Sequence, residues 1–176
     1  RHAKHRAETE EELRAAYAFR QAMSQSMVTG LRAIDLEGRI TFVNAAFCRM
    51  TGFDESELVG IKPPYPYWPA EEFDRLQNNI DTALAGNAPA SGFEMRIMRK
   101  SGERFAVRLY FSPLIGTNGQ QIGWMASMND ITEPKRVRVE LERAHERFVT
   151  VIDGLDSAVH VADVQTGEIL FANRAF

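Results

Sequence analysis

A ten-residue segment that occurs twice constrains this sequence more than any other feature. Residues 38–47 read GRITFVNAAF and residues 167–176 read GEILFANRAF, so Gly, Ile, Phe, Asn, Ala and Phe recur in the same order and spacing. Phe19 and Phe148 extend the match upstream at the same spacing. Self-similarity of this kind indicates repeated structural units. We therefore expect a fragment of a longer protein that holds one complete domain, a connector and the truncated start of a second copy.

The repeat predicts four parts. Residues 1–27 form a helix for signalling or dimerisation, 28–132 the complete domain, 133–155 a connector helix, and 156–176 the start of the second copy. The apolar positions of the connector step by four and three residues: Val137, Leu141, Ala144, Phe148, Val151 and Leu155. This heptad spacing is typical of coiled coils. It predicts a homodimer through the flanking amphipathic helices.

Composition and charge exclude several classes of partner and site. Charged residues make up 26% of the chain and the net charge is -3, without a Lys/Arg block, which argues against nucleic acid and anionic lipid as partners. Since no run of about 18 apolar residues occurs, we expect no membrane contact by this segment. The single cysteine, Cys48, excludes an intrachain disulfide and a multi-cysteine metal site, and fits a reducing cytoplasm. We expect a cytoplasmic location, although the full-length protein could be membrane-anchored.

The complete domain is predicted to contain five strands around a helical middle segment, 45–86. Alternating or apolar runs separated by Gly-containing turns give the strands 31–36, 39–44, 93–99, 103–113 and 121–131. Alternation places one set of side chains inward on the three long strands. On the opposite face it places Ile34, Met98, Tyr110 and Met125. The predicted fold class is α+β.

At this point the sequence resembles the PAS domains of sensory and signalling proteins, over about residues 21–132. The resemblance rests on the run from Asp35 to Phe47, on Met50-Thr-Gly-Phe53 with Glu57-Leu-Val-Gly60, on Arg99-Lys-Ser-Gly102 and on the closing Asp130-Ile-Thr132. It implies a PAS fold: a five-stranded antiparallel sheet with helices on one face, an inner cavity for a small ligand, and flanking helices that carry the signal. Tandem PAS domains of this style are typical of bacterial sensor histidine kinases, in two-component systems, and of diguanylate cyclases.

An apolar cavity is the candidate ligand site. Its expected helical walls are Phe47, Met50, Trp68, Phe73, Leu76 and Ile80, and its expected sheet walls are Phe93, Met95, Leu109, Phe111, Trp124 and Met128. The same pattern is also typical of a packed core without a ligand. Asp130 and Thr132 are the candidate signal relay, because side chains at a strand end can cap and orient the following helix.

The residues offer little for known cofactors or for catalysis. No histidine occurs between Arg6 and Arg143, which argues against haem ligated by histidine from the middle helix and against a nucleophilic site with a histidine base. Cys48 lacks the asparagine–cysteine–arginine context of light-oxygen-voltage sensors, which argues against a flavin–cysteine adduct. No metal site is expected, and the cofactor stays unknown.

These observations predict a regulatory module without enzymatic activity. It would bind a small ligand in the cavity and pass the signal through its flanking helices to an output domain outside this chain, of the sensor histidine kinase type. The alternative is a ligand-free dimerisation or interaction scaffold in the same kind of signalling protein.

Overall fold

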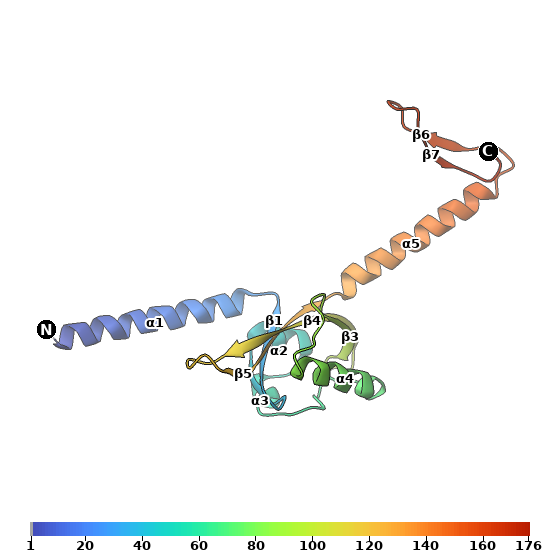
Figure 1. Ribbon diagram of the computed structural model, residues 1–176. Coiled ribbons are helices and arrows are strands. Elements are labelled where there is room, and N and C mark those ends of the chain that lie inside the picture. Colours follow the sequence, from blue (N-terminus) through green and yellow to red (C-terminus); the bar gives the residue numbers. More distant parts are fainter. Residues whose placement is uncertain (1) are drawn as a thin grey trace. The chain divides into compact units, whose positions relative to one another are not determined.

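A computed structural model describes residues 2–176, with side chains from residue 10 onward (Figure 1). Residue contacts divide the chain into two units, one ending at Thr132 and one beginning at Glu133. The elements of the first unit are α1 (His2–Ser26), β1 (Gly30–Asp35), β2 (Ile40–Val43), α2 (Ala45–Thr51), α3 (Glu55–Leu58), the 3-10 helix η1 (Ala70–Glu72), α4 (Phe73–Leu84), β3 (Phe93–Met98), β4 (Arg104–Ile115) and β5 (Gln121–Asp130). The second unit contains α5 (Thr132–Asp153), which begins at the boundary, then β6 (His160–Ala162) and β7 (Ile169–Ala172).

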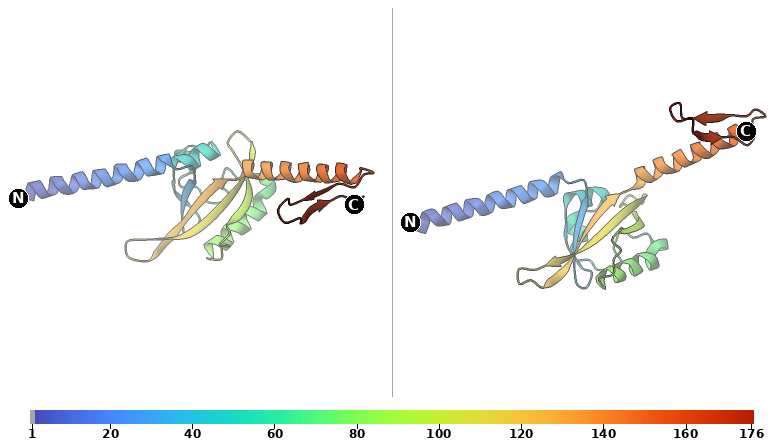
Figure 2. Two further views of the ribbon diagram at one scale, coloured as in Figure 1. Left: turned by 90° about the horizontal axis from the view of Figure 1, so that it is seen from above. Right: turned by 45° about the horizontal axis from the view of Figure 1, so that its top comes forward.

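The five strands of the first unit form one antiparallel sheet in the order β2-β1-β5-β4-β3. The first strand therefore pairs with the last, and β5 lies at the centre. All the helical elements between β2 and β3 pack on one face of this sheet, where the hydrophobic core lies (Figure 2). The predicted α+β class and five-stranded antiparallel sheet are confirmed.

Helix α2 begins where the sequence repeat places its asparagine. The carboxamide oxygen of Asn44 accepts a hydrogen bond from the backbone N–H of Phe47 at 2.9 Å, which caps the helix. The helix ends at Gly52, whose φ of 78° favours glycine because other residues rarely adopt it. These two residues fix α2 against β1 and β2.

The Pro-rich loop between α3 and α4 buries all three of its aromatic side chains. Tyr65, Tyr67 and Trp68 are each less than one tenth exposed, and the rings of Tyr65 and Tyr67 stack with centroids 5.3 Å apart. The Tyr65 hydroxyl donates to the carbonyl oxygen of Gly38 at 2.6 Å. The loop is thus part of the core and closes one side of it.

The register of β1 corrects one expectation from the sequence. Ile34 pairs with Trp124 and Arg32 pairs with Ala126 across the β1–β5 ladder. Directly opposed residues share a face of the sheet, so Ile34 points into the core, where it is fully buried. Its placement on the outer face was wrong, and Arg32, two residues earlier, also points inward.

The second unit repeats the hydrogen bonds of the first around its own asparagine. In the first unit, the Asn44 side chain accepts from Leu31 N at 2.8 Å and donates to the Thr29 carbonyl at 3.1 Å. In the second, Asn173 accepts from Val159 N at 2.7 Å and donates to the Ser157 carbonyl at 2.9 Å. The similarity between the two segments therefore extends to the contacts of single atoms.

Within residues 2–176, no helix combines the length and the apolar character that crossing a membrane requires.

Candidate functional site

A small cavity lies between the sheet, α4 and the aromatic loop. Its lining residues are Arg32, Tyr67, Trp68, Leu76, Asn79, Ile80, Met95, Ile97, Val107, Leu109, Phe111 and Met128. The volume open to the centre of a water molecule is about 20 Å³, which is room for about one water. Asn79, Met95 and Phe111 are half-buried, so the cavity approaches solvent on their side.

Seven of the twelve residues predicted as cavity walls lie around this space: Trp68, Leu76, Ile80, Met95, Leu109, Phe111 and Met128. Three belong to the aromatic loop and α4, and four to strands β3, β4 and β5. Elements far apart in the sequence meet here because the helices and the inward strand residues pack on the same face of the sheet.

The other five lie elsewhere in the core or at its edge. Phe47 is fully buried beneath β1, with its ring 5.5 Å from that of Tyr67. Met50 is at the end of α2, and Phe73, 39% exposed, begins α4. The Phe93 ring contacts that of Phe111 at 6.1 Å. Trp124 packs where β5 pairs with Ile34.

Sequence reasoning missed five lining residues: Arg32, Tyr67, Asn79, Ile97 and Val107. Alternation places Ile97 and Val107 on the inward face of their strands, but not every inward position was named as a cavity wall. Arg32 carried no comparable signal. A charged residue in a short strand is normally assigned to solvent, and only the pairing of β1 with β5 places it inside.

Arg32 is the most unusual group at the site. It is 2% exposed, and its Nη1 donates to the Tyr67 hydroxyl. Its guanidinium carbon lies 4.7 Å from the centre of the Tyr65 ring and 5.9 Å from that of Phe111. Its Nε and Nη2 have no hydrogen-bond partner. Two of its donor nitrogens are therefore buried and unused.

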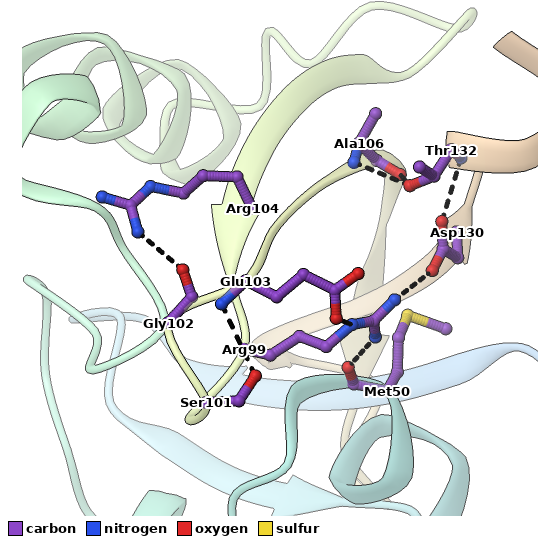
Figure 3. A network of polar contacts seen from close by, with 9 residues as sticks. All are labelled: Met50, Arg99, Ser101, Gly102, Glu103, Arg104, Ala106, Asp130 and Thr132. Atoms are coloured by element: carbon purple, nitrogen blue, oxygen red, sulfur yellow. Dashed lines mark hydrogen bonds and ion pairs between the residues drawn. The ribbon is translucent and has the colours of Figure 1, made fainter. Parts of the chain in front are cut away.

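A second polar cluster joins the end of β5 to the start of α5 (Figure 3). The Asp130 carboxylate accepts from Arg99 Nη2 at 2.8 Å and from the backbone N–H of Thr132 at 2.9 Å. The Thr132 hydroxyl in turn accepts from Ala106 N of β4 at 3.0 Å. The Arg99 Nη1 donates to the Met50 carbonyl at the end of α2. The structure thus brings both predicted relay residues into one network with β4, α2 and the β3–β4 turn.

Charges within this network favour the ionised form of Asp130. Partial burial opposes ionisation, but the hydrogen bonds from Thr132 and Arg99 outweigh it, and the pKa of Asp130 lies below its ordinary value. Asp130 is therefore an anion at neutral pH and can hold the Arg99 guanidinium and the first turn of α5 together.

Cys48 lies on α2 and is half-buried. Burial raises the pKa of its thiol, with a further contribution from Glu55. The protonated thiol is the weaker nucleophile, so this environment does not activate the residue.

Comparison with known proteins identifies relatives among bacterial signalling proteins. Residues 25–133 match the family described as "PAS domain". The chain is 38% identical over 146 residues to the C4-dicarboxylate transport sensor protein DctS of Rhodobacter capsulatus, covering 83% of this chain and 22% of that protein. It is 32% identical over 139 residues to a blue-light-activated histidine kinase of Rhizobium johnstonii, covering 79% of this chain and 39% of that protein. The chain therefore spans well under half of either relative.

Solved structures show the same fold. A PAS domain from Colwellia psychrerythraea matches with a TM-score of 0.56 and 19% identity, covering 67% of this chain and 98% of that one. An RNA-binding light-oxygen-voltage receptor matches with a TM-score of 0.60 and 18% identity, covering 73% of this chain and 37% of that one. At these identities the match concerns the fold alone.

Proposed function

This chain belongs to the PAS domain family, the regulatory sensory domains of proteins such as sensor kinases, and on that premise we propose that it binds a small ligand in its cavity and passes the signal to an output domain. The observation that carries the proposal is the path along β5. Met128 lines the cavity, Asp130 ends the strand, and α5 begins at Thr132. A ligand that displaces Met128 would act two residues from the anchor of α5.

Two further contacts support the path. Val107, which lines the cavity from β4, pairs directly with Asp130 of β5. Its neighbour Ala106 bonds both Thr132 and the backbone N–H of Ile131, the latter at 2.9 Å. Movement of β4 or β5 at the cavity would therefore change the geometry at the first turn of α5. Packed junctions of this kind can convert small shifts into larger movements.

Replacing Asp130 by alanine is expected to uncouple this junction. The Thr132 N–H would lose its acceptor, so hydrogen exchange at this amide should accelerate about tenfold or more, the equivalent of one lost hydrogen bond. In the full-length signalling protein, output should no longer respond to the stimulus. Hydrogen–deuterium exchange of the 176-residue chain and an output assay of the full-length protein measure the two effects.

Glu103→Ala is the matched control for this experiment. Glu103 accepts from Arg99 Nε at 3.0 Å but forms no hydrogen bond with Thr132 in the network of Figure 3. It should therefore leave exchange and output unchanged. Normal signalling by Asp130→Ala would refute the proposed route, while ligand binding itself could still be tested separately.

Dimerisation through the flanking helices is the second part of the proposal. Along α5, the predicted heptad positions Val137, Leu141, Phe148 and Val151 are each more than half exposed. Apolar side chains at this spacing are typical of a coiled-coil seam. We propose that a second copy of the chain covers this stripe and that the dimer carries the signal along α5.

Replacing Leu141 by glutamine is expected to weaken that dimer about 100-fold, because a dimer buries this leucine twice. Sedimentation velocity over a concentration series measures the change. Arg143→Gln is the control, since Arg143 is exposed and lies outside the heptad stripe. A wild-type chain that stays monomeric at high concentration, or a Leu141→Gln chain that dimerises normally, would contradict the proposal.

A further inference from the structure

The cavity contains a positive charge that its own protein surroundings leave unbalanced. Arg32 is buried, and none of the ion pairs found among the described side chains includes it. Its nearest polar partner is the Tyr67 hydroxyl, and burial raises the pKa of that phenol far above neutrality. Tyr67 is therefore uncharged under physiological conditions and offers only a dipole.

A charge in this position is costly unless something pairs with it. Removing an ion from water without a counter-charge costs several kcal/mol. Contacts with the faces of Tyr65 and Phe111 offset part of this cost, since cation–π contacts stabilise a desolvated cation. The two rings provide no hydrogen-bond acceptor for the Nε–H and Nη2–H groups, which lie in the plane of the guanidinium and have no partner.

The two unused nitrogens define the chemistry that would satisfy them. Nε–H and the neighbouring Nη2–H lie on one edge of the planar guanidinium and point the same way, while Nη1, on the other side, bonds Tyr67. Two parallel donors match the two oxygens of a carboxylate, which binds arginine in this bidentate way. The free edge of Arg32 thus offers the pair of donors that a carboxylate binds.

The remaining walls limit what is attached to that carboxylate. Of the twelve lining residues, Arg32 is the only charged one, and Tyr67, Trp68 and Asn79 are the only others whose side chains carry a hydroxyl, indole N–H or amide group. A second negative charge would have no cation to pair with there. The walls formed by Leu76, Met95, Leu109 and Met128 suit a short aliphatic body, and methionine side chains adapt readily to its shape.

We propose that Arg32 binds the carboxylate of a small aliphatic monocarboxylate, whose apolar body occupies the cavity between the sheet and α4. The inference rests on the proposed ligand-sensing function and names the class of ligand. Since the space holds about one water molecule as it stands, binding requires Met95 and Met128 to change rotamer. Met128 lies on the strand that leads to Asp130, so this movement is also the one that the proposed relay would detect.

The test uses the 176-residue chain and sodium salts of straight-chain monocarboxylates from acetate to hexanoate. Titration calorimetry and thermal melting are performed at constant ionic strength, with succinate, phosphate, chloride and the matched alcohols 1-butanol and 1-hexanol as comparison probes. We expect saturable binding of a monocarboxylate, with the melting temperature raised by about 4 °C or more at saturation. Succinate, phosphate, chloride and the alcohols should bind at least about tenfold more weakly.

Three variants separate a binding role from a structural one. Arg32→Met keeps most of the side-chain volume and removes the charge, so it should lower the affinity for the monocarboxylate about 30-fold or more. Without ligand, this variant should melt at the same temperature as wild type or higher. Arg32→Lys keeps the charge without the fork and should lose less affinity. Arg96→Met makes the same substitution at an exposed position of β3 and should change neither quantity.

The outcomes distinguish this inference from the proposed function on which it rests. If the alcohols bind as well as the carboxylates, and Arg32→Met does not weaken them, the cavity senses a neutral ligand and the assignment to Arg32 is wrong. If no probe binds and Arg32→Met melts well below wild type, Arg32 is a structural residue. The results then favour the ligand-free interaction scaffold over the ligand sensor. If an inorganic anion binds as tightly as the monocarboxylate, the aliphatic body is irrelevant and the named class is wrong.

Discussion

Replacing Asn44 by alanine is expected to lower the free energy of unfolding of the first unit by about 4 kcal/mol. The Asn44 side chain makes three hydrogen bonds to the backbone, with Leu31 N at 2.8 Å, Phe47 N at 2.9 Å and the Thr29 carbonyl at 3.1 Å. The residue is only 2% exposed, so alanine would leave backbone groups without partners in a place that water reaches poorly. Each such loss costs about 1–3 kcal/mol, and the lost helix cap is one of the three.

The sequence repeat supplies the control for this experiment. Asn173 makes the equivalent contacts with Val159 N and the Ser157 carbonyl in the second unit. Trp68 and Trp124, the two tryptophans of the chain, both belong to the first unit, so urea unfolding followed by tryptophan fluorescence reports that unit alone. Asn173→Ala should leave this transition within about 0.5 kcal/mol of wild type. If Asn44→Ala had the same urea midpoint as wild type, the three hydrogen bonds of Asn44 would contribute no net stability.

Replacing Gly123 by alanine is expected to lower the free energy of unfolding of the first unit by about 4 kcal/mol or more. A Cβ built on Gly123 would lie 2.0 Å from the carbonyl oxygen of Ile34. This oxygen belongs to the backbone of β1, so a rotamer change cannot relieve the clash and the two central strands would have to separate. The β1–β5 ladder joins the β1–β2 edge to the rest of the sheet, so its distortion affects the whole core.

Gly116→Ala is the matched control in the β4–β5 hairpin. A Cβ there would lie 2.9 Å from the Cγ2 methyl of Ile122, a side chain that is 52% exposed and free to turn away. We expect a loss of no more than about 1 kcal/mol. Circular dichroism and urea unfolding of both variants measure the difference. If the two variants were equally stable, β1 and β5 would accommodate a Cβ at position 123 without loss of stability, and the prediction would be wrong.

The sequence was sufficient for the order of the elements and for the faces of the long strands. Phe105, Val107 and Leu109 occupy alternate positions of β4, and all three are buried as alternation predicts. The recurrence of asparagine at positions 44 and 173 indicated two equivalent segments, and the two side chains make the same pair of backbone contacts. These are local properties, because periodicity and capping depend on residues close together in the chain.

The tertiary structure alone decided which inward residues enclose a cavity and that a charge lies among them. Alternation does not distinguish Leu109, which lines the cavity, from Trp124, which packs against Ile34, because both point to the same face. In the short strand β1, the apolar pattern was too brief to fix the face, and a shift of one residue moves every side chain to the opposite side. The pairing of Ile34 with Trp124 settled that register and turned Arg32 inward. A residue that would ordinarily belong to the surface thereby became the one charged group of the cavity, because strand pairing between distant segments, rather than local propensity, determines which side of a sheet a side chain occupies.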